Sequence, residues 1–146
     1  MLTFSTDQIK EISEQLNCGF RAFYHKQSGK LIFVPATDGN FDMDTSAWET
    51  ELAELNKNFI AYQEINAMQG SDSFKLMADF AAQVSDEKLR DRLLNSLNKK
   101  HPFREFKSMI DNSGEYRQRW FDFKNERYIL WTKDQINAQK EHDNLA

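Results

Sequence analysis

The sequence predicts an α+β fold, a mostly helical single domain with a small antiparallel sheet built on one hairpin. Two short runs rich in aromatic and β-branched residues, 20–25 and 30–35, flank the segment Lys26-Gln27-Ser28-Gly29, which is typical of a hairpin. From Thr45 onward, apolar residues recur mostly at helical spacing. Because an isolated hairpin is only marginally stable in water, we expect it to pack against helices.

One domain is the simplest organisation for a chain of 146 residues that holds no linker, repeat or low-complexity tract. Within the single domain 1–146 we expect three parts: an N-terminal helix and hairpin at 5–35, an acidic loop and helix at 38–58, and a helical half at 71–140. Hydrophobic residues make up 40% of the chain and aromatic residues 13%, which predicts an aromatic-rich core.

The first helix has clear signals at both ends. Ser5 and Gln8 match a capping box, in which each side chain bonds to the backbone N–H of the other residue. Apolar residues at helical spacing then continue to Leu16, and Gly19 can end the helix because it tolerates a positive φ.

The acidic part predicts a second helix. Ser46 and Glu49 match another capping box, and an apolar stripe follows it at Trp48, Leu52, Leu55 and Phe59. The pattern of residues 59–65 fits either an extended or a helical segment, so both readings stay open.

Three further helices are expected before a long last one. Ser71 or Ser73 begins the first, and Ser85 begins a leucine-rich helix. Pro102 suits the first turn of the third helix, where its missing N–H costs no hydrogen bond, and Gly114 separates that helix from the last.

Four residues form an aromatic signature that we expect to be architectural: Pro102, Phe103, Phe106 and Trp120. Pro102 should fix where its helix begins. The three rings recur at core spacing, so they should be largely buried in one cluster. We expect the leucine-rich helix, the helix at 102–112 and the last helix to form the main core.

The second half of the chain resembles a functionally uncharacterised family of small bacterial proteins. The resemblance rests on a leucine-rich helix with Leu93 and Leu97, then Lys100-His101-Pro102-Phe103-Arg104-Glu105-Phe106-Lys107, then Trp120-Phe121. Family members share this order, with a Lys-x-Pro-Phe-x-x-Phe-Lys segment followed by a Trp-aromatic pair. The resemblance implies the fold and a bacterial origin, and it leaves the function open.

Composition excludes several classes of function. A net charge of −4 argues against a nucleic-acid binder that uses its whole surface. The only cysteine, Cys18, excludes an intrachain disulfide and a cluster of thiolate metal ligands. The sequence has neither an apolar run long enough for a membrane span nor the features of a signal peptide, so we expect a cytoplasmic protein that makes no membrane contact.

The segment 38–49 mimics a calcium loop. Oxygen-bearing side chains stand at the spacing of loop ligands: Asp38, Asn40, Asp42, Asp44 and Glu49. Met43, however, holds the sixth position, where the sharp turn requires glycine. A solvated acidic loop before a helix explains the same residues, so we expect no bound metal.

The function cannot be determined from the sequence. We find no nucleophile constellation, phosphate loop or dinucleotide motif, and we therefore expect neither enzyme activity nor a cofactor. The leading hypothesis is a non-enzymatic protein-interaction or regulatory module with an unknown protein partner. Its partner surface would be either the acidic segment 38–54 or the basic face around Arg104.

The alternative hypothesis is weak nucleic-acid binding through the basic face around residues 99–107. Cations are interleaved there with aromatic residues, as in proteins that pair phosphate neutralisation with base stacking. The candidate residues are Lys99, Lys100, Arg104 and Lys107.

Overall fold

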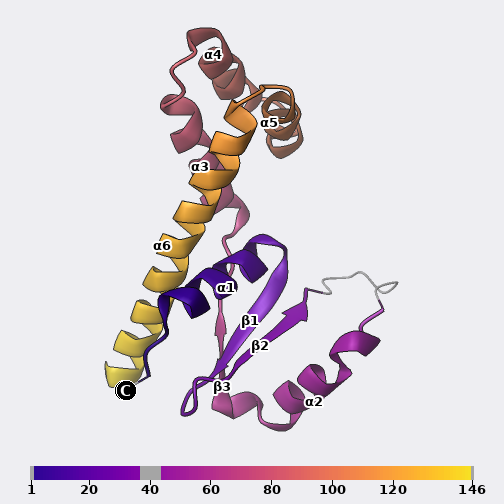
Figure 1. Ribbon diagram of the computed structural model, residues 1–146, viewed down its shortest axis with the longest axis vertical. Helices are drawn as coiled ribbons and strands as arrows, with labels where there is room; N and C mark the ends of the chain where they lie inside the picture. Colours follow the sequence, from indigo (N-terminus) through magenta and orange to yellow (C-terminus); the bar gives the residue numbers. More distant parts are fainter. Residues whose placement is uncertain (1, 37–43, 146) are drawn as a thin grey trace. The chain divides into compact units, whose positions relative to one another are not determined.

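The computed structural model describes residues 2–36 and 44–145 (Figure 1). These residues form six α-helices and a three-stranded antiparallel sheet, which confirms the mostly helical α+β class. In chain order the helices and strands are α1 (Thr6–Asn17), β1 (Phe20–His25), β2 (Leu31–Pro35), α2 (Glu49–Lys57), β3 (Tyr62–Ile65), α3 (Gly70–Ala82), α4 (Glu87–Ser96), α5 (Pro102–Asp111) and α6 (Tyr116–Leu145).

The chain divides into two compact units. The first unit combines Met1–Ala67 with Tyr128–Ala146, and the second is Met68–Arg127. Helix α6 therefore contributes its first turns to the second unit and its later turns to the first. The prediction that the whole chain forms one domain stays a prediction.

The predicted hairpin forms the centre of the sheet in the first unit. Strands β1 and β2 pair antiparallel, with Phe23 opposite Ile32. Strand β3 adds to the other side of β1, with Glu64 opposite Phe23, so the strand order is β2-β1-β3. The open question about residues 59–65 thus has a mixed answer, a 3₁₀ turn at Phe59–Ala61 followed by a strand.

Helices cover both faces of this sheet. Side chains alternate between the faces of a strand, so Tyr24 and Phe23 point to opposite sides. The ring of Tyr24 contacts Phe4, which precedes α1, and its hydroxyl donates to Gln139 of α6 at 3.2 Å. Phe23 instead belongs to the cluster that α2 completes on the other face. The expectation that helices support the hairpin is confirmed.

Only one of the two predicted capping boxes forms. At the start of α1, the Gln8 N–H donates to Ser5 Oγ at 3.1 Å and the Ser5 N–H donates to Gln8 Oε1 at 2.9 Å. The prediction of a capping box at Ser46 and Glu49 is wrong. Ser46 lies in a 3₁₀ turn, α2 begins only at Glu49, and the Ser46 N–H donates to the Asp44 carboxylate at 3.0 Å.

The apolar stripe of α2 is shorter than predicted. Trp48, Leu52 and Leu55 pack against the sheet. Phe59 is 69% exposed, because the chain has already left α2 for the 3₁₀ turn that leads into β3.

Two helix starts in the second unit differ from the predicted serines. Helix α3 begins at Gly70, where the Asp72 carboxylate accepts the N–H of Gln69 at 2.9 Å, so neither Ser71 nor Ser73 caps it. Helix α4 is capped by Asp86 and not by Ser85. Aspartate and serine are about equally good caps, so the sequence pattern alone does not separate such neighbours.

The core of the second unit confirms the predicted burial of two of the three signature rings. Phe106 is 1% exposed and Trp120 is 9% exposed, and their ring centroids lie 5.0 Å apart. The burial predicted for Phe103 is wrong, since this side chain is 48% exposed. Helical side chains lean toward the N-terminus, so a residue in the first turn of α5 projects beyond the start of that helix. Pro102 is the first residue of α5, as predicted.

Candidate functional site

The four predicted cations lie on the surface of the second unit. Lys99 and Lys100 follow α4, and Arg104 and Lys107 lie one turn apart on α5; all four side chains are exposed. None of these side chains forms an ion pair or hydrogen bond with another residue that the structure describes. We call these four residues the basic hairpin surface, because they lie on the helical hairpin α4–α5.

The charge around this surface is strongly positive. Residues 88–107 contain seven Lys or Arg and two acidic residues, a net charge of +5 within a chain of net charge −4. Lys88 and Arg92, which the sequence analysis did not single out, are exposed one turn apart on α4 and add to it. Their spacing of four residues on a predicted helix was the available signal.

Two further arginines of the second unit, Arg117 and Arg119, are exposed but paired. Arg117 lies 3.5 Å from the Asp111 carboxylate and 4.9 Å above the centre of the Phe121 ring. Arg119 lies 3.4 Å from Glu115. Their charges are balanced within the unit, whereas the charges of the four residues of the basic hairpin surface are not paired by any residue that the structure describes.

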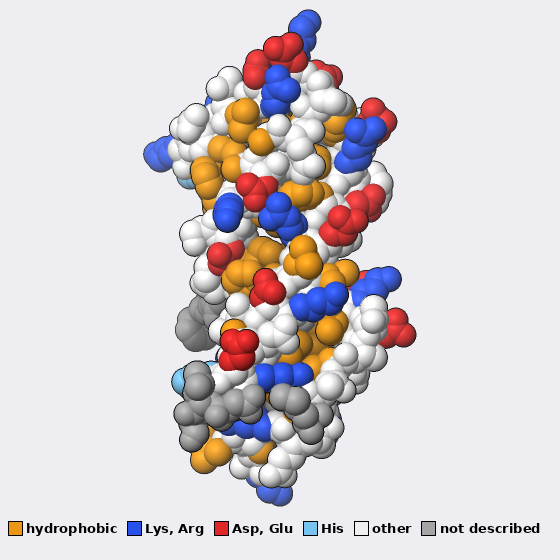
Figure 2. Space-filling view, turned by 90° about the vertical axis from the view of Figure 1, so that its left-hand side faces the viewer, with side chains coloured by type: hydrophobic (Ala, Val, Ile, Leu, Met, Phe, Trp, Pro, Cys, Tyr) orange, Lys and Arg blue, Asp and Glu red, His pale blue; other side chains and the backbone are white. Residues whose placement is uncertain are grey.

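Apolar surface accompanies these cations. The exposed ring of Phe103 is the immediate neighbour of Arg104 along α5, and Lys107 follows it by one helical turn. Leu94 of α4 is 37% exposed. Figure 2 shows another face of the molecule, on which hydrophobic side chains are likewise visible between side chains of both charges.

Two carboxylates of the acidic segment, those of Asp44 and Glu54, are engaged in local hydrogen bonds. Glu54 accepts bonds from the Asn58 amide at 3.0 Å and the Tyr62 hydroxyl at 3.1 Å, and these bonds hold the pKa of Glu54 below its ordinary value. Burial, and then the bond to Glu54, raise the pKa of Tyr62. The backbone N–H of Ser46 lowers the pKa of Asp44. These carboxylates tie α2 to the chain on either side of it.

The predicted calcium ligands are only partly described. Asp38, Asn40 and Asp42 lie outside the described residues, while Asp44 and Glu49 line a shallow hollow beside α2. Among residues 2–36 and 44–145, no group of three acidic, histidine or cysteine side chains is arranged to hold a metal ion.

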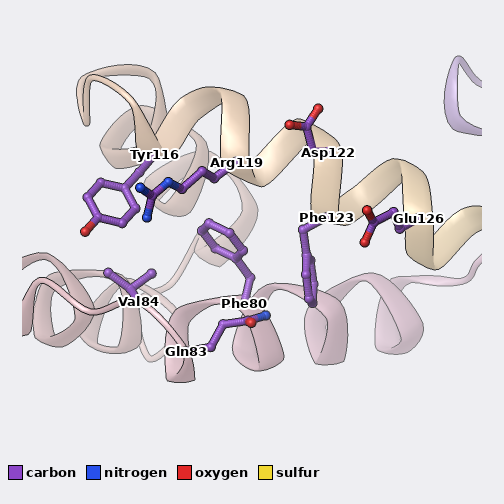
Figure 3. A pocket seen from close by; sticks show the side chains of 8 residues that line it. All are labelled: Phe80, Gln83, Val84, Tyr116, Arg119, Asp122, Phe123 and Glu126. Atoms are coloured by element: carbon purple, nitrogen blue, oxygen red, sulfur yellow. The ribbon is translucent and has the colours of Figure 1, made fainter.

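A pocket that the sequence analysis did not single out lies between the end of α3 and the first turns of α6 (Figure 3). It has a volume of about 270 Å³ and lies within the second unit. Its lining residues, which we call the α3–α6 pocket, are Phe80, Gln83, Val84, Tyr116, Arg119, Asp122, Phe123 and Glu126. Tyr116 and Glu126 lie toward opposite ends, with the rings of Phe80 and Phe123 between them (Figure 3).

The α3–α6 pocket combines an apolar floor with a charged rim. Phe80 and Val84 of the floor are at most 5% exposed. Asp122 and Glu126 of the rim are exposed on α6, one turn apart. The pocket joins residues that are more than 30 positions apart in the sequence, so helical periodicity alone could not have located it.

No helix within the described part of the chain is both long and apolar enough to cross a membrane.

Comparison with known proteins finds one family and one relative. The sequence model of a family described as "Uncharacterised protein family (UPF0158)" matches residues 3–143. The protein named "UPF0158 protein PA5073", from Pseudomonas aeruginosa, is 31% identical over 130 residues, which cover 88% of this chain and 80% of the relative. No solved structure matches the chain.

Proposed function

We propose that the chain, which belongs to the uncharacterised protein family UPF0158, is a non-enzymatic binding module that docks an acidic protein partner on its basic hairpin surface. Membership in the family confirms the resemblance of the sequence to uncharacterised bacterial proteins and assigns no activity. One observation carries the proposal: four exposed cations, without ion-pair or hydrogen-bond partners among the described residues, lie within four sequence positions of an exposed phenylalanine. The proposal places this interaction in the bacterial cytoplasm.

The mixture of charge and apolar surface supports a protein partner. Aromatic and arginine side chains carry much of the binding energy in protein interfaces, and Phe103 and Arg104 offer both side by side. Arginine can bind a carboxylate through two parallel hydrogen bonds. Lys99, Lys100 and Lys107 would speed the encounter with an acidic surface, because complementary charges steer association.

The hydrogen bonds within the acidic segment favour the basic hairpin surface, and not the acidic segment, as the docking site. Asp44 and Glu54 are engaged in hydrogen bonds that hold α2 in place. A partner that bound these carboxylates would compete with those bonds. A partner of the basic hairpin surface has no such competition from the described residues.

Nucleic-acid binding is the second candidate. The exposed Phe103 ring among cations favours it, since a base could stack there while its phosphates meet the lysines. The buried state of Phe106 and Trp120 counts against it, because only one signature ring is left for stacking. The net charge of −4 also opposes long-range attraction of a polyanion to the whole chain.

Affinity purification from a bacterial lysate tests the proposal. The wild-type chain is compared with a variant in which the four cations of the basic hairpin surface are replaced by glutamine. A matched control removes four exposed lysines elsewhere, at Lys10, Lys57, Lys75 and Lys133. Each sample is treated with and without nuclease at low salt, and retained proteins are identified by mass spectrometry.

A protein partner should be retained by the wild-type chain and by the control, lost from the surface variant, and unaffected by nuclease. Loss of all retained material on nuclease treatment would favour nucleic acid instead. Equal retention by the surface variant and the wild-type chain would contradict any docking role for these four residues.

A further inference from the structure

We propose that the α3–α6 pocket binds a small organic cation, an ammonium or guanidinium group carried on an apolar stem. The pocket shares no residue with the basic hairpin surface, so this inference does not depend on the proposed function. A volume of about 270 Å³ suits a small ligand.

The aromatic rings of the pocket already receive cations from the chain itself. The guanidinium of Arg119 lies 4.9 Å from the centre of the Tyr116 ring, and that of Arg127 lies 4.9 Å from the centre of the Phe123 ring. A cation over an aromatic face is attracted by the ring's electron density. The surroundings of both rings therefore allow a cation to lie over the ring face.

The charges of the pocket favour a cationic ligand over an anionic one. The two arginines are matched by carboxylates, Arg119 by Glu115 at 3.4 Å and Arg127 by Asp79 at 3.2 Å. Glu126 has no ion-pair or hydrogen-bond partner among the described residues. The pocket therefore has unmatched negative charge at its rim.

The spacing of the rim carboxylates adds to the preference for a cationic ligand. Asp122 and Glu126 are four residues apart on α6, and like charges at this spacing repel each other and destabilise a helix. Asp122 accepts a hydrogen bond from the Gln118 amide at 2.9 Å, which is neutral and leaves the charge in place. A bound cation would relieve this repulsion.

The apolar floor of the pocket favours a ligand whose uncharged part is an apolar stem. Phe80 and Val84 offer a hydrophobic base, and the Gln83 side chain lies beside Phe80 (Figure 3). A ligand with an apolar stem would cover the floor while its cationic end meets Glu126. A fully hydrated metal ion would leave the floor uncovered.

NMR titration of the ¹⁵N-labelled chain with phenethylamine tests the inference. The carboxylate analogue 3-phenylpropionate has the same stem and opposite charge, and serves as the ligand control. A short peptide with one central lysine tests whether the cation is better presented by a protein side chain. Two variants are compared, Glu126→Gln in the pocket and Asp134→Asn, which removes the same charge from an exposed position of α6 outside it.

Phenethylamine should shift the amide signals of Gln83, Tyr116 and Phe123 in a saturable manner, and 3-phenylpropionate should not. Glu126→Gln should weaken binding about fivefold, the most that one exposed ion pair contributes. Asp134→Asn should leave the affinity unchanged. Tighter binding of the peptide than of phenethylamine would identify a protein side chain as the source of the cation. Unsaturable shifts, equal shifts with the carboxylate analogue, or an unchanged affinity of Glu126→Gln would overturn the inference.

Discussion

Truncation of Phe106 to alanine measures how far the aromatic signature holds the second unit together. Phe106 is 1% exposed and lies in one cluster with Leu93, Ile110 and Trp120. We expect Phe106→Ala to lower the free energy of unfolding by about 3–5 kcal/mol. This is a large part of the roughly 5–15 kcal/mol that stabilises an ordinary domain.

The expected magnitude has three parts. Burial of a phenylalanine side chain contributes about 1.5–3 kcal/mol through the apolar area removed from water. The Phe106 and Trp120 rings meet edge to face at a centroid distance of 5.0 Å, and such a pair adds about 0.5–1.5 kcal/mol. The remaining loss comes from the cavity, since the surrounding helices can relax only partly.

Phe103→Ala is the matched control, because it makes the same chemical change three residues earlier on α5. The Phe103 side chain is 48% exposed, so about half of the burial energy is absent and the loss should be about 0.8–1.5 kcal/mol. Urea unfolding followed by circular dichroism gives the free energy of each variant, and tryptophan fluorescence reports on the combined surroundings of Trp48, Trp120 and Trp131. Equal losses for the two variants would refute the claim that only the inner rings of the signature are architectural.

Three smaller predictions concern local bonds. Asp86→Ala should cost about 1 kcal/mol in urea unfolding because its carboxylate caps α4 by accepting the Leu89 N–H at 3.1 Å, and an unchanged midpoint would contradict this role. Ser13→Ala should cost about 1–3 kcal/mol because it removes the 2.8 Å bond to the fully buried Thr132 hydroxyl; an unaltered melting temperature would argue against it. The pKa of Glu54 is lowered in the fold, so its stabilising effect is present above its unfolded pKa and is lost as the pH falls through its folded pKa. The melting temperatures of Glu54→Gln and the wild-type chain should therefore converge between neutral pH and about pH 3, and a constant difference would show that the charge of Glu54 is not the cause.

The parts of the fold that the sequence predicts are those with local signals. The hairpin has two strand-like runs around a glycine-containing turn, and the structure pairs them as expected. The start of α1 depends only on Ser5 and Gln8, and that of α5 on Pro102, so no distant residue is needed to locate them.

The three misplaced helix starts each have an aspartate within two residues of the predicted serine. Near Ser46, Ser71 and Ser85, the carboxylate of that aspartate accepts a backbone N–H. At α4 the aspartate replaces the serine as the cap, and both residue types cap helices well. Helices α2 and α3 instead follow Trp48 and Gln69, which are not residue types that the usual capping preferences indicate. Strand β3 has only four residues, too few for its period to be separated from that of a helix.

The candidate sites also divide into a part with a local signal in the sequence and a part without one. The basic hairpin surface could be predicted because its cations are close in sequence, whereas the exposure of Phe103 depends on where the start of α5 lies relative to its neighbours. The α3–α6 pocket joins Phe80 to Glu126 from different helices. Only the tertiary structure brings such residues together.

Site-specific photo-crosslinking tests the docking role of the basic hairpin surface most directly. A photoreactive phenylalanine analogue is placed at Phe103 in living bacterial cells, and at Phe59 as a control, an exposed aromatic position in the first unit. We predict that irradiation yields a protein adduct of defined mass from position 103 and none from position 59. The adduct should disappear when Lys100, Arg104 and Lys107 are also replaced by glutamine. The absence of an adduct at 103, or an adduct that survives these replacements, would contradict the proposed docking surface.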